Sequence, residues 1–336
     1  MSDLRLQQLE SWLKDYAGLE GFRISVASAD ASFRRYFRVH LGERTLIAMD
    51  APPDKEDCRP FVRIAKALSA VGLHVPDILC EDLGHGFLLL SDLGDVQYAQ
   101  VLNADTVESL YGDAMDALFH LQTEPKPVLE LPPYDHALLL REMDLFKDWF
   151  LGTHLGITLT DQQAGELAKI CELLSKSALN QPQVWVHRDY HSRNLMKLDD
   201  NNPGVLDFQD AVVGAATYDL VSLLRDCYVA WPRSQVEAWV DAYRQRLNQA
   251  GLTANVDQAT FQRWFDWMGV QRHMKATGIF ARLNHRDGKA GYLKDIPRTL
   301  GYVLQVSEDY DELRPLYDLL TQVVAQRYDL TTGQLR

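Results

Sequence analysis

Residues 187–194 read His-Arg-Asp-Tyr-His-Ser-Arg-Asn, and residues 207–210 read Asp-Phe-Gln-Asp. Short apolar runs lie around both segments, so the pattern predicts polar loops between short strands, at 184–186, 195–198 and 204–206. Phosphoryl transfer needs a carboxylate to orient and deprotonate the attacking hydroxyl. It also needs oxygen ligands that hold Mg²⁺ on the nucleotide phosphates. Asp189, Asn194 and Asp207 supply these groups, and we therefore predict a phosphoryl-transfer site here.

The chain before this stretch has the pattern of an antiparallel sheet with helices. Three strand-like runs separated by turn residues predict a meander, at 22–27, 33–41 and 45–50. A helix is predicted at 3–17 and a second from Lys55, followed by strands at 78–81 and 87–91. We expect these elements to form a first lobe over residues 1–93.

The rest of the chain, residues 94–336, has mainly helical periodicity. It predicts a helical lobe that carries the catalytic loop, with helices at 105–122, 135–151, 161–179, 218–229, 234–250, 257–284 and 308–326. Asp219, at the start of one of these helices, is predicted to brace the loop.

Composition and charge exclude several classes of protein. The 336 residues have a formal net charge of −13, which disfavours a broad surface for nucleic acid or anionic membrane. The four cysteines lie far apart, without the spacing of a zinc site or the density of a secreted disulfide scaffold. We find no signal peptide or membrane-spanning run and expect a cytoplasmic protein. The sequence does not indicate an oligomeric state.

The spacing His-x-Asp-x-x-x-x-Asn, followed by the strand-ending Asp207-Phe208, resembles the catalytic and metal loops of the protein-kinase-like fold. With Tyr218-Asp219-Leu220 beyond it, the chain is most similar to the aminoglycoside phosphotransferase and choline kinase family. This resemblance implies an α+β, bilobal protein-kinase-like fold, with an N-terminal antiparallel sheet plus helix and a mainly helical C-terminal lobe. It implies ATP as donor, Asp189 as catalytic base, and Asn194 and Asp207 as Mg²⁺ ligands.

The segment after Asp207 bears on the acceptor. Residues 208–217 leave no room for the activation segment of a protein kinase before the next helix. A small-molecule acceptor is therefore favoured over a protein.

The resemblance also locates a nucleotide site in the first lobe. The turn between the first two strands would cover the ATP phosphates, through Ser32, Phe33 and Arg34. Ser91 and Leu93 lie in the segment that resembles the hinge, whose backbone pairs with adenine. The arginines of the turn have a second interpretation, as exposed strand residues.

One position departs from the family pattern. Met49 stands on the third strand where the pattern has a phosphate-binding lysine. Either an arginine from the turn or a basic residue of the next helix, such as Arg63 or Lys66, replaces it. The alternative is a nucleotide-binding pseudokinase without activity, although the predicted base and both metal ligands favour an active enzyme.

A basic helical stretch offers a site for an anionic acceptor. Residues 270–298 contain seven Lys or Arg and two Asp, and helical spacing places Arg272, Lys275, Arg282 and Arg286 along one face. Such a face suits a substrate carboxylate. A solvated basic face is the alternative.

Segments 141–150, 271–275 and 280–289 resemble one subgroup of the family, which phosphorylates amino sugars of the cell wall. The resemblance implies transfer from ATP to the anomeric C1 hydroxyl of N-acetylmuramic acid and N-acetylglucosamine, in cell-wall recycling. The implied substrate contacts are Asp210, Glu142, Arg272, Lys275 and Arg282, and Asp210 has solvent exposure as its alternative.

Other acceptors remain open, namely an aminoglycoside, a choline-like amine or a different sugar. A kinase for a polycation needs an acidic acceptor face, so the basic stretch argues against the first of these.

Overall fold

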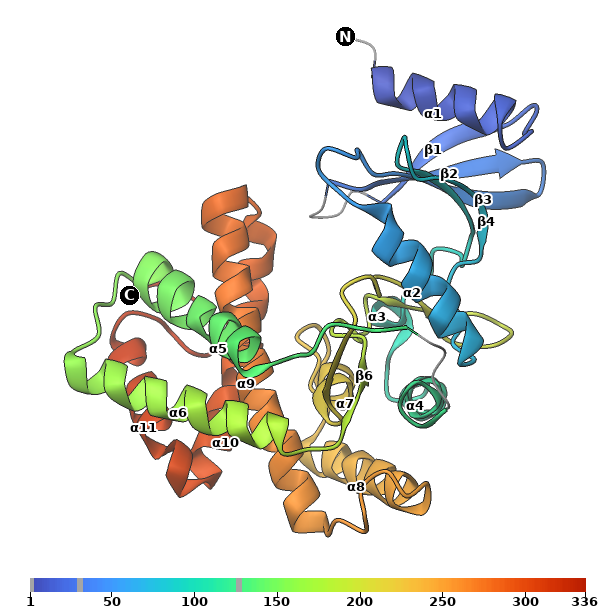
Figure 1. The fold of residues 1–336 in the computed structure, drawn as a ribbon. Helices are drawn as coiled ribbons and strands as arrows, with labels where there is room; N and C mark the ends of the chain where they lie inside the picture. The colour runs from blue at the N-terminus through green and yellow to red at the C-terminus, as the bar shows by residue number, and fades with distance from the viewer. Residues whose placement is uncertain (1–2, 29–32, 125–128) are drawn as a thin grey trace. The chain divides into compact units, whose positions relative to one another are not determined.

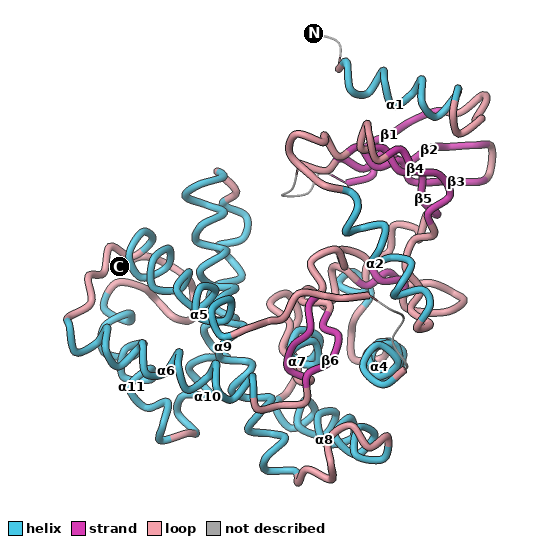
Figure 2. The backbone as a smooth tube through the Cα atoms, viewed as in Figure 1, coloured by secondary structure: helices cyan, strands magenta, loops and turns pink. Residues whose placement is uncertain are grey.

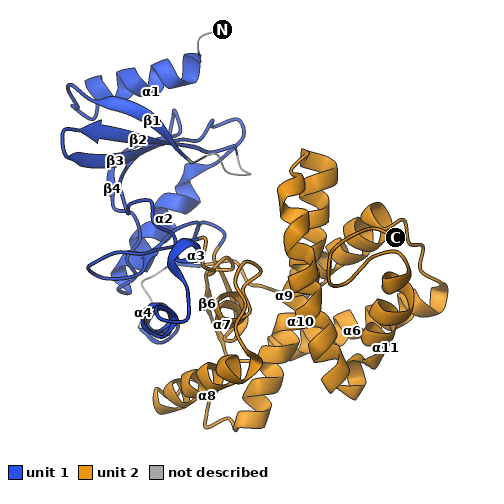
Figure 3. Ribbon diagram, turned by 180° about the vertical axis from the view of Figure 1, so that it is seen from behind, with its two compact units in different colours: residues 1–130, 194–210 blue, residues 131–193, 211–336 orange. Residues whose placement is uncertain are grey.

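The computed structural model describes residues 3–28, 33–124 and 129–336. The backbone divides into two compact units, which are residues 1–130 with 194–210, and residues 131–193 with 211–336 (Figure 3). This division differs from the predicted lobe boundary at residue 93, because residues 94–130 and 194–210 belong to the first unit.

A five-stranded antiparallel sheet forms the centre of the first unit. Its strand order is β1-β2-β3-β5-β4, with β1 Arg23–Ser28, β2 Arg35–Leu41, β3 Arg44–Asp50, β4 Ile78–Asp82 and β5 Phe87–Ser91. The predicted meander and the two later strands are therefore confirmed.

Two helices cover the faces of this sheet (Figure 1). On α1 (Leu4–Asp15), Leu9, Trp12 and Leu13 are buried against β2, β3 and β5 in one apolar cluster. Helix α2 (Cys58–Ala70) buries an apolar stripe that includes Phe61 and Ile64 on the other side. Both helices begin at an aspartate whose side chain accepts a backbone hydrogen bond, which fixes their starts.

A later part of the chain folds into this unit. It comprises α3 (Tyr98–Val101), α4 (Val107–Thr123) and a hairpin of β7 (Leu195–Met196) with β8 (Gly204–Val205). The Asn202 side chain donates hydrogen bonds of 2.7 Å to Tyr98 and to Asp113, so the hairpin loop is fixed to both helical segments.

The second unit is mainly helical (Figure 2). Its helices are α5 His136–Leu145, α6 Asp161–Leu179, α7 Tyr218–Leu224, α8 Arg233–Gln249, α9 Gln258–Asp287, α10 Ile296–Asp309 and α11 Arg314–Asp318. Short π or 3₁₀ segments join them, at Phe146–His154, Ala290–Asp295, Asp311–Leu313, Leu319–Val323 and Val324–Gln326. Two strands, β6 (Gln183–Val186) and β9 (Val212–Ala215), form an antiparallel pair.

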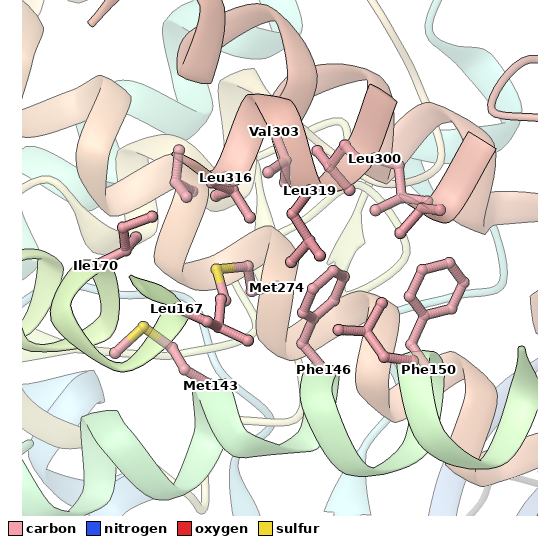
Figure 4. Packing of buried hydrophobic residues seen from close by; sticks show 14 of the residues in the cluster. Met143, Phe146, Phe150, Leu167, Ile170, Met274, Leu300, Val303, Leu316 and Leu319 are labelled. Atoms are coloured by element: carbon pink, nitrogen blue, oxygen red, sulfur yellow. The ribbon is translucent and has the colours of Figure 1, made fainter. Parts of the chain in front are cut away.

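Helix α9 supplies part of the main core of this unit. Met274 lies among apolar side chains from other elements, including Phe146, Leu167, Leu300 and Leu316 (Figure 4). Because α9 is surrounded by packed neighbours, many of its polar residues are also buried and need internal partners.

The fold class is as predicted, and the local differences have tertiary causes. Helix α10 was not predicted, although Pro297 occupies its first turn, where a missing N–H costs little. The predicted helix 308–326 is broken into several short segments, and the predicted helix 135–151 continues from α5 into a π-helical segment. Strand β9 lies between Asp207 and α7, where no strand was predicted. Within the described ranges, no helix is long and apolar enough to cross a membrane.

Helix α9 lies close to the backbone of Leu145 and Phe146 at Gly278, and this contact leads to a stability prediction. A Cβ added there would lie 2.6 Å from the Phe146 nitrogen and still closer to the Leu145 carbonyl, so Gly278→Ala must move backbone. We expect the free energy of unfolding to fall by about 3 kcal/mol in urea titrations followed by circular dichroism.

Gly301→Ala is the matched control, since an added Cβ there in α10 meets nothing within 4 Å. It removes the helix penalty of glycine and should raise stability by up to about 1 kcal/mol. Equal effects of the two substitutions would contradict the packing argument.

Candidate active site

The loop that carries Asp189 begins where strand β6 ends. Val184, Trp185 and Val186 are buried, and β6 is hydrogen-bonded along its length to β9, so the start of the loop is fixed. Arg188 has a φ of 78°, which residues other than glycine rarely adopt. Such a conformation costs roughly 1–3 kcal/mol and persists only where its surroundings hold it.

A buried carboxylate on α7 holds the first end of this loop. The Asp219 side chain accepts hydrogen bonds from the backbone N–H groups of His187 at 2.6 Å and Arg188 at 3.0 Å. It is fully buried, so its oxygens depend on these donors rather than on water. The predicted bracing role of Asp219 is confirmed.

A second buried carboxylate holds the other end. Asp226, just beyond α7, accepts hydrogen bonds from the N–H groups of Ser192 at 2.9 Å and Tyr228 at 2.8 Å. Sequence reasoning missed this residue, because only the folded chain brings Asp226 to Ser192. The loop 187–192 is thus anchored at both ends by carboxylates from opposite ends of one short helix.

Asp189 lies between these anchors and is partly exposed. Burial raises the pKa of this carboxyl, but the charges of Lys275, His191, Arg272 and His187 together hold the pKa below its ordinary value. The side chain is therefore an ionised carboxylate at neutral pH, as a group that accepts a proton must be.

A buried polar network surrounds Glu142, on α5. Its carboxylate pairs with Arg188 and with Lys275, whose Nζ lies 3.1 Å from Oε1, and it accepts a hydrogen bond from Tyr134. Lys275 also donates to the Tyr218 hydroxyl at 3.1 Å. Burial raises the pKa of Glu142, yet the two cations bring it below its ordinary value.

The four residues of the basic face predicted on α9 differ in their exposure to solvent. Arg272 and Lys275 are 5% and 8% exposed, whereas Arg286 is exposed and pairs with Asp287. Arg282 lies between them and is half-buried. Arg272 and Lys275 are the two members of this face whose charges act on Asp189.

The predicted metal ligands belong to the first unit, where the β7–β8 hairpin brings them to one end. Leu195 pairs with Val205, and the N–H of Leu206 donates to the Asn194 carbonyl at 2.9 Å. Asn194 precedes β7 and Asp207 follows Leu206 directly, so the two side chains start from neighbouring points of the backbone.

Asp207 has a constrained environment of its own. Its φ is 63°, in the left-handed region, and the next residue, Phe208, is fully buried with its ring 4.8 Å from that of Phe61 on α2. Gln209 donates to the Asp207 carboxylate at 2.8 Å, and Arg34 lies 4.0 Å from the same oxygen. Packing of Phe208 thus holds the unusual backbone.

The donor set of Asn194 and Asp207 suits Mg²⁺, which takes oxygen ligands and usually keeps water and substrate phosphates in its remaining positions. No group of three or more His, Cys, Asp and Glu side chains in the described parts of the chain is arranged to hold a metal by itself. A cation here would depend on oxygens from a bound nucleotide.

The other predicted nucleotide contacts lie in the first unit. Ser32 falls outside the described residues, while Phe33 is 62% exposed and Leu93 is buried at 7%. The Ser91 hydroxyl accepts a hydrogen bond from the N–H of Asp77 at 2.8 Å.

The segment around Ser91 and Leu93 is braced by an ion pair that sequence reasoning missed. Arg38 of β2 donates to Asp92 at 2.6 and 3.1 Å and to the Gly94 carbonyl at 2.9 Å. Asp210, a predicted substrate contact, is exposed and also belongs to the first unit.

The structure therefore groups the predicted residues into two sets. Asn194, Asp207 and Arg34 lie together in the first unit. In the second unit Asp189 lies near Lys275 and Arg272, and Lys275 contacts Glu142.

Comparison with solved structures defines the class of fold. The chain superposes on an ADP-bound aminoglycoside phosphotransferase with a TM-score of 0.60 at 15% identity, covering 91% of this chain and 99% of that one. Choline kinase from Cryptosporidium parvum gives a TM-score of 0.63 at 10% identity, covering 94% and 99%. At such identities the likeness establishes the fold, which is the kinase-like fold of small-molecule phosphotransferases.

Sequence comparison establishes the family. The model of the phosphotransferase enzyme family matches residues 23–256. The chain is 46% identical to the N-acetylmuramate/N-acetylglucosamine kinase of Pseudomonas putida, over 96% of this chain and 98% of the relative. It is 41% identical to the enzyme of that name from Neisseria meningitidis, over 97% and 98%. The chain belongs to the phosphotransferase enzyme family and is a kinase.

The Glu142 network yields a second prediction. Glu142→Gln keeps the side-chain shape but removes the carboxylate that pairs with Arg188 and with the buried Lys275. Breaking a buried pair on one side costs about 3–5 kcal/mol, and we expect a loss of that size in urea unfolding.

Glu172→Gln is the control, because Glu172 pairs with Lys176 at 3.1 Å on the surface and is 41% exposed. Its loss should be below about 1 kcal/mol. A Glu142→Gln protein as stable as this control would show that the network does not stabilise the fold.

Proposed function

We propose that the chain is an ATP-dependent kinase that phosphorylates the anomeric C1 hydroxyl of N-acetylmuramic acid and N-acetylglucosamine. The observation that carries this proposal is the 46% identity, over 96% of the chain, to a relative named N-acetylmuramate/N-acetylglucosamine kinase. The anomeric position is the part of the proposal that rests on chemistry and on the resemblance of 141–150, 271–275 and 280–289 to the amino-sugar subgroup.

Asp189 acts as the base in this proposal. The acceptor oxygen attacks the γ-phosphorus, the bond from that phosphorus to the β–γ bridging oxygen breaks, and ADP leaves. The hydroxyl proton goes to the Asp189 carboxylate. A hemiacetal hydroxyl is more acidic than an ordinary alcohol, so a carboxylate with a lowered pKa accepts its proton late in the reaction.

The first unit supplies the nucleotide contacts. Asn194 and Asp207 would hold Mg²⁺, which neutralises charge on the transferred phosphoryl group when it is bound. The backbone near Ser91 and Leu93 would pair with adenine, and the turn that contains Ser32 and Phe33 would cover the phosphates.

The second unit supplies most of the acceptor contacts. Arg272 and Arg282 are the cations proposed to meet the lactyl carboxylate of N-acetylmuramic acid. Lys275 and Glu142 neutralise one another, so their contribution is to shape and orient the site. Asp210, from the first unit, is proposed to accept a sugar hydroxyl.

The product would be a sugar 1-phosphate, whose anomeric phosphate is the group that a nucleotidyltransferase needs to make a nucleotide sugar. This places the reaction in cell-wall recycling, in the cytoplasm where ATP is available. Neither nucleic acid nor a membrane takes part in it.

A substrate panel tests the proposal directly. With MgATP, we expect N-acetylmuramic acid and N-acetylglucosamine to stimulate ADP release, while methyl N-acetylglucosaminide, whose C1 oxygen is blocked, does not. Phosphorus NMR should detect an anomeric phosphate. Turnover of the methyl glycoside would move the phosphorylated position away from C1, and turnover of choline or an aminoglycoside alone would assign a different acceptor.

Asp189→Asn tests the base. It keeps the side-chain shape but cannot accept a proton, so we expect turnover to fall by roughly 100- to 10,000-fold. ADP affinity, measured by calorimetry, should stay within about twofold, since Asp189 belongs to the acceptor side of the reaction. Asp199→Asn, on a fully exposed side chain, is the control and should behave as wild type. Unchanged turnover in the Asp189→Asn protein would remove Asp189 from this role.

A further inference from the structure

The third strand of the first unit has no lysine, and helix α2 has no glutamate that could pair with one. In protein kinases that lysine pairs with a glutamate on the neighbouring helix and contacts the nucleotide phosphates. Here Met49 is fully buried on β3, and α2, with sequence Cys-Arg-Pro-Phe-Val-Arg-Ile-Ala-Lys-Ala-Leu-Ser-Ala, has no acidic residue. A lysine at 49 would therefore be a buried cation without a counter-charge from α2.

Most basic side chains around the β1–β2 turn and α2 are paired with other carboxylates. Arg35 binds Asp50, and Arg38 binds Asp92. Lys66 lies 3.5 Å from Glu81 and is 64% exposed. These contacts hold the sheet and its helices together.

The remaining basic positions next to the turn and on α2 are at the surface. Arg59 pairs with Asp57, and Lys55 with Asp54 at 3.8 Å. Arg63 points outward from α2 and is exposed.

Arg34 differs from all of these in its partner and its burial. Its side chain is 13% exposed, and its Nη2 lies 4.0 Å from Oδ1 of Asp207. Burial raises the pKa of the Cys58 thiol to about 11, and Arg34 opposes this rise, so its charge also reaches the first residue of α2. The guanidinium of Arg34 thus lies near a predicted Mg²⁺ ligand, and its charge acts on the start of α2.

We propose that Arg34 replaces the missing third-strand lysine and binds the nucleotide phosphates, with Asp207 holding it in place until Mg²⁺ and nucleotide bind. This inference rests on the proposed use of ATP but not on the identity of the acceptor. A guanidinium binds phosphate oxygens through two N–H groups at once, which a lysine does not do. Arg34 precedes β2 directly, so this charge would not have to lie on β3, where Met49 is fully buried.

Arg34→Gln is the variant that tests this role, with binding measured by calorimetry in the presence of Mg²⁺. We expect ADP affinity to fall by roughly 10- to 100-fold, in the range of lost charge-assisted hydrogen bonds. Adenosine, which has no phosphate, should bind as tightly as it does to wild type. Arg34→Lys should recover part of the ADP affinity, since it restores charge without the second N–H group.

Arg44→Gln is the matched control. Arg44 is an exposed arginine at the start of β3, at the end of the strand away from Met49, and its substitution should change ADP affinity by less than about twofold. Arg63→Gln tests the alternative cation. The proposal is overturned if Arg34→Gln leaves ADP affinity unchanged, if it weakens adenosine as much as ADP, or if Arg63→Gln produces the loss instead.

These outcomes are separable from those of the proposed function. A wild-type protein that binds ADP through Arg34 but phosphorylates no amino sugar would keep this inference and reject the acceptor. If the wild-type protein phosphorylates amino sugars but the Arg34→Gln protein keeps full ADP affinity, the proposed function stands and the role of Arg34 is rejected.

Discussion

The candidate base depends on two buried carboxylates that carry no part of the chemistry. Asp219 and Asp226 accept backbone N–H groups at opposite ends of the loop 187–192. Each carboxylate would be costly to bury alone, and each loop N–H would be costly to leave unpaired, so the two requirements satisfy one another. The strained φ of Arg188 persists because this mutual constraint exceeds its cost. These hydrogen bonds therefore link the loop to both ends of α7 and hold the backbone on either side of Asp189.

Two cations of α9 contribute to the ionised state of Asp189. Lys275 and Arg272 come from the buried length of α9, where a cation is tolerated only because carboxylates lie near it. The Lys275 ammonium interacts with two carboxylates, Glu142 and Asp189. Its pairing with Glu142 therefore does not prevent it from lowering the pKa of Asp189. The result is an ionised base in a partly desolvated loop. Stability of the core and readiness of the base thus depend on the same ion network.

Local sequence patterns predicted most of the first unit and the loops of the candidate site. Alternating apolar residues and turn signals identified the strands of the sheet. Polar segments between short strands indicated Asn194 and Asp207 as candidate ligands. The residues that sequence reasoning missed act over long separations. Asp226 and the Arg38–Asp92 pair have no local signature, because their partners are defined only by the fold. Helical spacing placed Lys275 on a binding face, but it did not predict that Lys275 pairs with Glu142. Helix α10 depends on burial against α9, which a sequence window does not contain.

Two packed aromatic rings, Phe208 next to Asp207 and Phe61 on α2, provide a contact between the candidate metal site and α2 that needs no ion pair between strand and helix. Phe208 is buried against Phe61 of α2, so an apolar contact links α2 to the residue next to Asp207, the predicted metal ligand. Apolar packing of this kind is insensitive to salt, whereas an exposed ion pair is screened. The positive charge is then free to lie where the phosphates are expected, at the start of β2. Arg34 pairs with Asp207, and its charge acts on Cys58 at the start of α2. The residue proposed to bind the phosphates therefore interacts with both the candidate metal ligand and α2.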